Sequence, residues 1–306
     1  MKKAGCALVF ALFAVLAGPA FCAGSIRILT SIFPLREFAA AVVGERGEAS
    51  LLLPPGAGVH TWQPRPSDIL RLAASDLFIS VGSGLEPWLP AIVKTVPGGK
   101  LHLLEVSRGL ALLPAMADQP EPAGAGHDHG PLDPHIWLDF GLDASVIDRI
   151  VEALSAIDPA GAGYFRQNGE SYKVRLRELD SRFREALKNC AGRQMVVAGH
   201  AAFGYLAKNY GLVQTALYGL SPDSQPRPKQ MMKVVDLCRR ENIRTIFFEA
   251  SVPPDLARTL AAEIHGRILV LHAGHNLTRE QVMKGVSFFD IMEENLRSLR
   301  EGLGCR

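Results

Sequence analysis

Short apolar runs alternate with amphipathic segments along most of this sequence. In the first half, runs rich in β-branched and other apolar residues predict four buried strands, at residues 26–30, 49–53, 77–81 and 101–106. Apolar residues at helical spacing predict three helices among them, at residues 33–43, 67–74 and 86–96. Ser67, between Pro66 and Asp68, is expected to cap the second helix. Strands that alternate with helices indicate βαβ units and a parallel sheet.

The second half repeats this alternation. Strands are predicted at residues 195–198, 213–217, 245–249 and 267–271. Helices are predicted at residues 203–210, 229–241 and 254–264, and one last long helix at residues 279–302. Both halves are therefore expected to be α/β units.

A long amphipathic segment separates the two halves. Residues 160–188 carry an apolar stripe at helical spacing, and at ~1.5 Å per residue they predict a helix of ~40 Å. We interpret this helix as a rigid connector. The expected fold class is α/β: two βα lobes with parallel sheets, joined by one long connector helix. The expected boundaries are an N-terminal lobe of residues 24–158, a connector of residues 159–189 and a C-terminal lobe of residues 190–306.

The first 23 residues differ in character from the rest. Lys2 and Lys3 precede an apolar run of residues 4–16, which small residues follow. A basic start, a short apolar core and a small-residue exit are the parts of a secretory signal peptide, and the run is shorter than the ~20 residues of a spanning helix. We therefore expect residues 1–23 to be a signal peptide and the mature protein to act in the periplasm. Cys22 as a lipid-anchored first residue is the alternative, which the bulky Phe21 disfavours.

The composition limits the classes of partner. Lys and Arg number 33 against 31 Asp and Glu, so no strong field of one sign points to nucleic acid as a partner. Three cysteines remain after the signal peptide, and their spacing fits no zinc-binding cysteine motif. One disulfide and one spare thiol are expected in an oxidising compartment, with Cys238 and Cys305 as the pair and Cys190 left over.

Several histidines stand where a ligand would bind. His60 follows the predicted strand at residues 49–53, His200 follows the strand at residues 195–198, and His272 comes directly after residue 271. In open α/β sheets, ligands bind beyond the carboxyl ends of the strands. Imidazole suits Zn, Cu, Ni and Fe, whereas Mn and Mg prefer more oxygen. Histidines from both halves, with no nearby pair of carboxylates, predict a transition-metal site in the cleft between the lobes, with zinc favoured.

Several motifs add a family resemblance. Residues 54–64 read Pro-Pro-Gly-Ala-Gly-Val-His-Thr-Trp-Gln-Pro, and residues 84–88 read Gly-Leu-Glu-Pro-Trp. Further along stand Asp-Pro-His-Ile-Trp-Leu-Asp, Gly-His-Ala-Ala-Phe-Gly-Tyr and Ile-Phe-Phe-Glu-Ala, which begin at residues 133, 199 and 246. In this order, these motifs resemble the zinc/manganese family of periplasmic solute-binding proteins that serve ABC importers. The resemblance spans essentially all of the mature chain.

The resemblance implies a function and a set of metal ligands. It implies that the chain captures Zn²⁺ as cargo, without catalysis, and delivers it to the permease of an ABC importer. It implies His60, His135 and His200 as metal ligands. We expect Asp133 to orient an imidazole and the protein to be a monomer. Manganese-selective relatives tend to have Glu at the position of His200, so the histidine there argues for zinc.

The fourth ligand stays open, because this chain departs from the family there. Members of the family usually have Asp where this chain has His272, so the candidates are His272, the nearby His275 and a water molecule. We favour His272, which gives His60, His135, His200 and His272 as the expected site. Glu249 is a further candidate, which we interpret as a supporting residue. A loop with His127 and His129 resembles a short form of the family's His-rich loop, and it either collects metal weakly or has no role.

Two other classes of function compete with this interpretation. A zinc hydrolase would need three protein ligands, an open position and a general base. The sequence has no His-Glu-x-x-His motif, and Glu249 is the one candidate base near these histidines. A metal-scavenging surface adhesin is the second class, and manganese or iron are alternative cargoes. We expect a transport protein and not an enzyme.

Overall fold

The computed structural model describes residues 25–96, 101–115, 131–217, 228–249 and 254–306. The first lobe contains one parallel sheet with the strand order β2-β1-β3-β4. Its strands are β1 (Ile26–Thr30), β2 (Gly47–Leu51), β3 (Leu77–Ser80) and β4 (His102–Glu105). Its helices among these strands are α1 (Phe33–Val43), α2 (Pro66–Ala73) and α3 (Leu89–Val93). No helix in the described ranges combines the length and apolar character that a membrane span requires.

The second lobe repeats the arrangement of the first. Its sheet is again parallel, with the order β6-β5-β7-β8. The strands are β5 (Gln194–Ala198), β6 (Val213–Ala216), β7 (Thr245–Glu249) and β8 (Arg267–Leu271). The helices among and after them are α6 (Gly204–Asn209), α7 (Pro228–Arg240), α8 (Asp255–Glu263) and α9 (Arg279–Met283). The predicted fold of two parallel-sheet α/β lobes is therefore confirmed.

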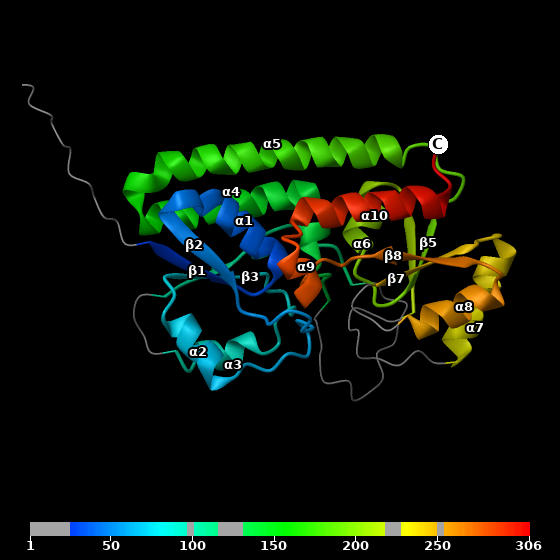
Figure 1. The fold of residues 1–306 in the computed structure, drawn as a ribbon, viewed down its shortest axis with the longest axis horizontal. Coiled ribbons are helices and arrows are strands. Elements are labelled where there is room, and N and C mark those ends of the chain that lie inside the picture. The colour runs from blue at the N-terminus through cyan, green and yellow to red at the C-terminus, as the bar shows by residue number, and fades with distance from the viewer. Residues whose placement is uncertain (1–24, 97–100, 116–130, 218–227, 250–253) are drawn as a thin grey trace, which may run out of the picture.

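Three long helices form a layer that connects the lobes (Figure 1). They are α4 (Phe140–Ile157), α5 (Ala162–Ala186) and α10 (Phe288–Leu303). The 25 residues of α5 correspond to about 37 Å of helix, and the helix runs along the top of both lobes in Figure 1. The long helix expected between the two lobes is thus present.

The last helix also returns to the first lobe. Phe288, at the start of α10, packs edge-on against Phe38 of α1, with the ring centroids 5.2 Å apart. Phe289 lies 5.1 Å from the ring of Tyr172 on α5. Because these apolar side chains come from both lobes, one continuous core extends through the helical layer.

Three expectations about local structure are wrong. Helix α2 begins after Arg65, whose main-chain N–H donates to Asp68 at 2.9 Å. Pro66 therefore takes the first helical position, and Ser67 does not cap the helix.

The single helix expected at residues 279–302 is interrupted between α9 and α10. Gly285 there has a φ of +64°, and the Ser287 hydroxyl accepts from the N–H of Asp290, which starts a new helix.

The third error concerns the disulfide, which joins Cys190 to Cys305 and not Cys238 to Cys305. Cys190 follows the end of α5 and Cys305 follows the end of α10, and these two helix ends lie beside each other. Cys238 is a free thiol on the buried face of α7, where burial raises its pKa to about 11. The thiol therefore packs as a small apolar group.

Candidate metal centre

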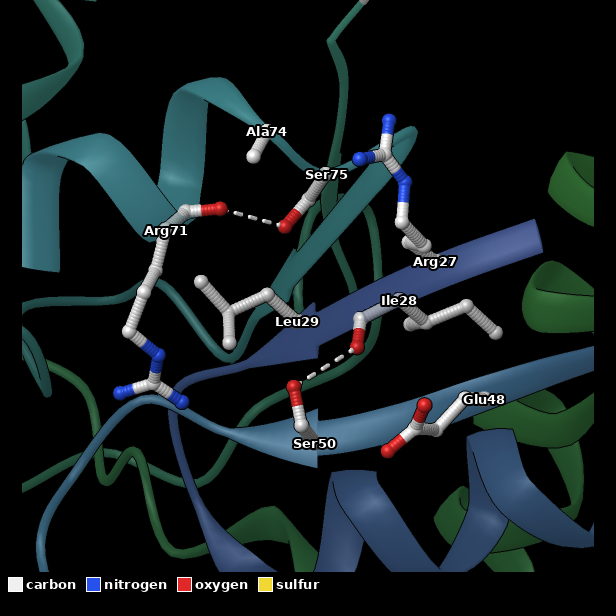
Figure 2. Close-up of a pocket in the computed structure, with 8 residues that line it drawn as sticks. All are labelled: Arg27, Ile28, Leu29, Glu48, Ser50, Arg71, Ala74 and Ser75. Atoms are coloured by element: carbon white, nitrogen blue, oxygen red, sulfur yellow. Dashed lines mark hydrogen bonds between the residues drawn. The ribbon is translucent and has the colours of Figure 1, made fainter. Parts of the chain in front are cut away.

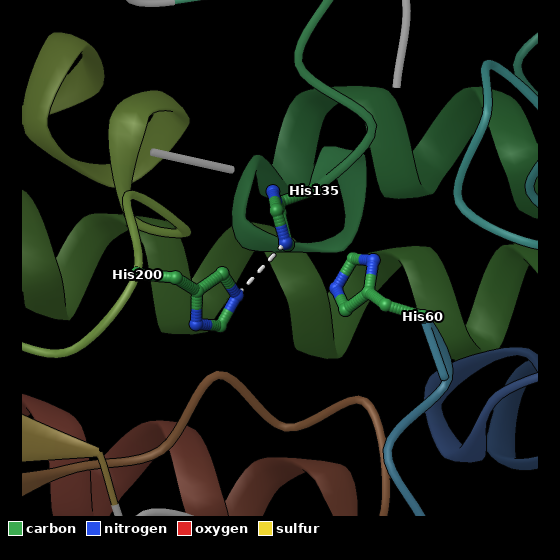
Figure 3. Close-up of side chains that lie close together, drawn as sticks. All are labelled: His60, His135 and His200. Atoms are coloured by element: carbon green, nitrogen blue, oxygen red, sulfur yellow. Dashed lines mark hydrogen bonds between the residues drawn. The ribbon is translucent and has the colours of Figure 1, made fainter. Parts of the chain in front are cut away.

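Three histidines from distant parts of the chain converge between the two lobes. His60 lies in the segment that follows β2, His135 immediately precedes a short 3₁₀ turn (Ile136–Leu138), and His200 follows β5. Each offers a ring nitrogen that lies within 4.8 Å of the nitrogens of the other two. Figure 3 shows the three imidazoles directed towards one another. All three side chains are buried, with exposures of 1% or less. This is the arrangement expected of ligands around one ion.

The spacing of two of these nitrogens fits a tetrahedral zinc ion. Nε2 of His135 lies 3.2 Å from Nε2 of His200. Zinc–nitrogen bonds of 2.0–2.1 Å in a tetrahedron place two nitrogens about 3.3–3.4 Å apart. The ring of His60 lies 5.9 Å from that of His135 and 5.7 Å from that of His200, measured between centroids. An ion at this point would therefore need only small movements of the side chains.

Two buried carboxylates orient the imidazoles. Nδ1 of His135 donates to Asp133 at 2.8 Å, and Nδ1 of His200 donates to Glu249 at 2.5 Å. A carboxylate that accepts from Nδ1 leaves Nε2 unprotonated, as the nitrogen that binds a metal. Burial lowers the pKa of His135, although Asp133 acts in the opposite direction, so this imidazole stays neutral at physiological pH. The predicted role of Asp133 in orienting an imidazole is confirmed, and Glu249 does the same for His200.

The position of His60 depends on a tryptophan that the sequence analysis did not single out. The indole Nε1–H of Trp88 donates to the carbonyl of Val59 at 2.9 Å, which fixes the main chain next to His60. Trp62 packs edge-on against Trp88, with the ring centroids 4.9 Å apart. The signal was present in the Gly-Leu-Glu-Pro-Trp motif, because a buried indole needs an acceptor for its N–H group.

The segment after β8 is tied to the first lobe at several points. The N–H of Phe33 donates to the carbonyl of His275 at 2.9 Å, and the indole of Trp137 donates to that of Ala273 at 2.5 Å. The side-chain amide of Asn276 donates to the carbonyls of Pro54 and Ala57, both at 2.8 Å. Because Pro54 and Ala57 precede His60, this segment positions the His60 loop as well as its own histidines.

Neither His272 nor His275 belongs to the group of nitrogens within 4.8 Å. His275 comes near it, because its ring centroid lies 6.4 Å from that of His60. It is buried, and its Nδ1 makes no hydrogen bond within the described part of the chain. His272 instead directs Nε2 at Glu294, at a distance of 3.3 Å. His127, His129 and the expected signal peptide of residues 1–23 lie outside the described residues.

A pocket elsewhere in the first lobe has a different lining. It lies between α2 and the strands β1 and β2, and Figure 2 shows Arg27, Arg71, Ser50 and Ser75 around it. The two hydroxyls donate to the carbonyls of Ile28 and Arg71, and Arg27 forms an ion pair with Asp76. These polar groups are bonded to other groups of the protein. The lining of the pocket contains no histidine, so it does not resemble the group of His60, His135 and His200.

Comparison with known proteins identifies the family. The family described as zinc-uptake complex component A, periplasmic, matches residues 28–302. The chain belongs to this family. It is 31% identical over 281 residues to the high-affinity zinc uptake system protein ZnuA of Bacillus subtilis. The alignment covers 91% of this chain and 88% of that protein.

Streptococcal relatives give the same result. The chain is 29% identical over 289 residues to the zinc-binding protein AdcA of Streptococcus pyogenes, and spans 56% of that longer protein. The Zn(II)-bound ZnuA-like domain of Streptococcus pneumoniae AdcA superposes with a TM-score of 0.77 at 28% identity. The superposition covers 92% of this chain and 99% of that domain. The predicted resemblance is therefore confirmed, and members of this family are transport components and not enzymes.

Proposed function

We propose that this chain captures one zinc ion between its lobes through His60, His135 and His200 and delivers it to the membrane permease of an ABC importer. The observation that carries this proposal is the convergence of three buried imidazole nitrogens within 4.8 Å. The carboxylates of Asp133 and Glu249 behind two of the rings add to it. Family membership supports the same role, because the family is that of the periplasmic component of zinc uptake.

The donor set favours zinc over manganese or iron as cargo. Three neutral imidazoles suit zinc, whereas manganese prefers sites with more oxygen ligands. The nearest carboxylates, Asp133 and Glu249, are hydrogen-bonded to Nδ1 atoms of the histidines. They increase the basicity of the nitrogens that face the ion and hold the rings in place.

His275 completes the coordination in this proposal, in place of His272. Its ring centroid lies 6.4 Å from that of His60, and its Nδ1 is buried without a hydrogen bond in the described residues. Burial lowers the pKa of His275 to about 4, with Glu249 acting in the opposite direction, so the imidazole is neutral and ready to bind a cation. The His275 ring lies outside the group of three nitrogens, and a small movement of this ring would bring it to the ion.

The organisation of the chain follows from the same role. A signal peptide of residues 1–23 directs export, residues 24–158 and 190–306 are the two metal-binding lobes, and residues 159–189 connect them. Helix α5 lies within that connector. The protein acts as a monomer, because both sides of the metal centre come from one chain.

Metal analysis of the purified protein tests the proposal. The expected result is one equivalent of zinc per chain, and a higher affinity for zinc than for manganese in competition with a chromophoric chelator. Alanine at His60, His135 or His200 should each abolish tight binding. Alanine at His102 or His265, which lie outside the group, should leave it intact. Tighter binding of manganese, or one equivalent of zinc retained by the three variants, would refute the proposal.

A further inference from the structure

A second pair of metal-ligand side chains lies beside the centre, closer to solvent. Nε2 of His272 lies 3.3 Å from Oε2 of Glu294. The side chain of His272 is 12% exposed and that of Glu294 is 47% exposed, so both are accessible to an ion from solution. An imidazole nitrogen and a carboxylate oxygen are both common zinc ligands. The pair differs in this access from the three buried histidines of the centre.

The spacing of the pair also fits two ligands of one ion. Zinc–nitrogen bonds of about 2.0–2.1 Å and zinc–oxygen bonds of about 2.0–2.2 Å place two tetrahedral ligands about 3.3–3.5 Å apart. The observed 3.3 Å falls in this range. Without a metal, the imidazole and the carboxylate face each other as a hydrogen-bonded pair. A cation can therefore bind between His272 and Glu294 without a rearrangement of the main chain.

Helix α10 fixes the position of His272. The side chain of Asn295, which is buried, accepts from the N–H of His272 at 2.8 Å and donates to its carbonyl at 2.9 Å. Glu294 is the preceding residue of the same helix. Two consecutive residues of α10 therefore hold the main chain of His272 and face its imidazole, so the pair is built into rigid elements.

Glu249 connects the pair to the three histidines. In the parallel register of β7 and β8, Glu249 lies beside Leu271, which immediately precedes His272. The same carboxylate accepts from Nδ1 of His200. Burial lowers the pKa of His272, while Glu294 and Glu249 both act to raise it, which is consistent with a carboxylate near both sets of ligands. A negative charge at this place favours the movement of a cation from the outer pair to the centre.

We propose that His272 and Glu294 form an outer subsite, where an incoming divalent cation exchanges bound water for its first two protein ligands. The inference rests on the proposed function, because the subsite serves the centre of three histidines. Two protein ligands leave the other coordination positions to water, so the subsite binds the ion weakly and releases it readily. The centre, with three or four imidazoles, binds it more tightly, and the difference in affinity drives the transfer inward. A dissociating ion passes through the same subsite.

Binding kinetics test this proposal. The probe is Zn²⁺ itself, mixed by stopped flow with the metal-free full-length protein in the presence of a chromophoric zinc chelator. Glu294→Gln keeps the shape of the side chain and removes its charge, and His272→Gln removes the imidazole. The matched control is Glu293→Gln, on the same helix, where the carboxylate pairs with Arg182 and not with a histidine.

The expected result is a slower exchange of zinc in the two outer variants. The association rate constant should fall about tenfold, at the low end of what a focused charge contributes to an on-rate. The dissociation rate should fall with it, so that the dissociation constant changes much less than either rate. Glu293→Gln should behave as the wild type does.

Two outcomes would overturn the inference. One is that Glu294→Gln exchanges zinc at the wild-type rate. The other is that His272→Gln loses equilibrium affinity as strongly as His60→Ala, which would make His272 a ligand of the centre. Failure of the proposed function would look different, because the wild-type protein itself would then not retain one equivalent of zinc.

Discussion

The side-chain amide of Asn276, in the second lobe, donates to the carbonyl of Ala57, in the first lobe, at 2.8 Å. A further bond from the same nitrogen reaches the carbonyl of Pro54, also at 2.8 Å. These contacts lie three and six residues before His60, and Asn276 follows His275 directly. One asparagine thus sets the distance between two histidine-bearing loops that are more than 200 residues apart in the chain.

Replacing Asn276 should loosen the metal centre. In Asn276→Ala, two partly solvent-accessible carbonyls lose their donor, and a hydrogen bond of this kind contributes about 0.5–1.5 kcal/mol. We expect zinc affinity to fall about tenfold, because the His60 loop is no longer held against the second lobe. Asn168→Ala is the control. It also removes a side-chain amide that donates to a carbonyl, that of Val42, but this bond joins α5 to α1 and not the two histidine-bearing loops. Equal zinc affinities of the two variants, measured by chelator competition, would contradict the prediction.

Glu249→Gln should weaken zinc binding without removing a ligand. The glutamate accepts from Nδ1 of His200, and the neutral amide orients and polarises that ring less well. Partners of this kind typically contribute 10–100-fold to metal affinity, so we expect a loss of about that size. The control is Glu263→Gln, an exposed carboxylate that pairs with Arg239. An affinity equal to that of the wild type would show that Glu249 does not support His200 in this way.

Alanine variants of the two remaining histidines should separate their roles. His275→Ala should weaken equilibrium binding of zinc about 10–100-fold, because it removes the proposed fourth ligand. His272→Ala should have a much smaller effect on the dissociation constant, since its Nε2 faces Glu294. The measurement is a zinc titration in competition with a chelator at neutral pH. The reverse order of the two effects would assign the fourth position to His272.

Zinc affinity should persist below the pH at which an ordinary histidine side chain becomes protonated. Protonated imidazole does not bind a metal, and the reference pKa is about 6.5. Burial lowers the pKa of His135 and lowers that of His275 to about 4, so both rings stay neutral as the pH falls through 6.5. We expect the dissociation constant to change little as the pH falls through about 6.5 and to rise steeply only in more acidic solution. A steep loss of affinity already between about pH 7 and 6, as the reference pKa gives, would contradict this.

A buried acid in the helical layer should make stability fall as the pH rises. Asp143 is fully buried on α4, and neither carboxylate oxygen has a hydrogen bond in the described residues. Burial raises its pKa well above the usual value, and Asp139 adds to this. The folded protein therefore keeps a proton that the unfolded chain releases above a pH of about 3.9, which destabilises the fold in neutral solution.

Asp143→Asn should remove this penalty. The amide stays neutral at every pH, so we expect the variant to be more stable than the wild type at pH 8, with a difference that shrinks towards pH 4. A gain of about 1 kcal/mol would raise the melting temperature by roughly 2–4 °C. Asp148→Asn is the control, because that carboxylate lies exposed on the same helix and pairs with Lys173. Equal melting temperatures of Asp143→Asn and the wild type at pH 8 would refute the prediction.

Local patterns in the sequence were sufficient to predict the secondary structure and the fold class. The strands at residues 26–30, 245–249 and 267–271 and the helix at residues 33–43 begin and end where the pattern placed them. These elements have apolar runs bounded by Gly, Pro or polar residues, so local chemistry determines their ends. Because ligands bind beyond the carboxyl ends of parallel strands, the same pattern marked His60 and His200 as candidate ligands, each after a strand of its own sheet.

Contacts between distant parts of the chain decided the rest. Cys190 pairs with Cys305 because the ends of α5 and α10 meet, and nothing in their spacing of 115 residues indicates that. Likewise, the sequence favoured His272 over the nearby His275 as the fourth ligand, but no local pattern shows which ring points at the other histidines. Asn295 on α10 and Trp137 on the first lobe fix the main chain between them and determine which ring faces the other histidines. The sequence determined the ligand chemistry and the order of strands and helices, because both depend on neighbouring residues. The tertiary structure alone decided which side chains meet, because that depends on packing between segments that are far apart in the chain.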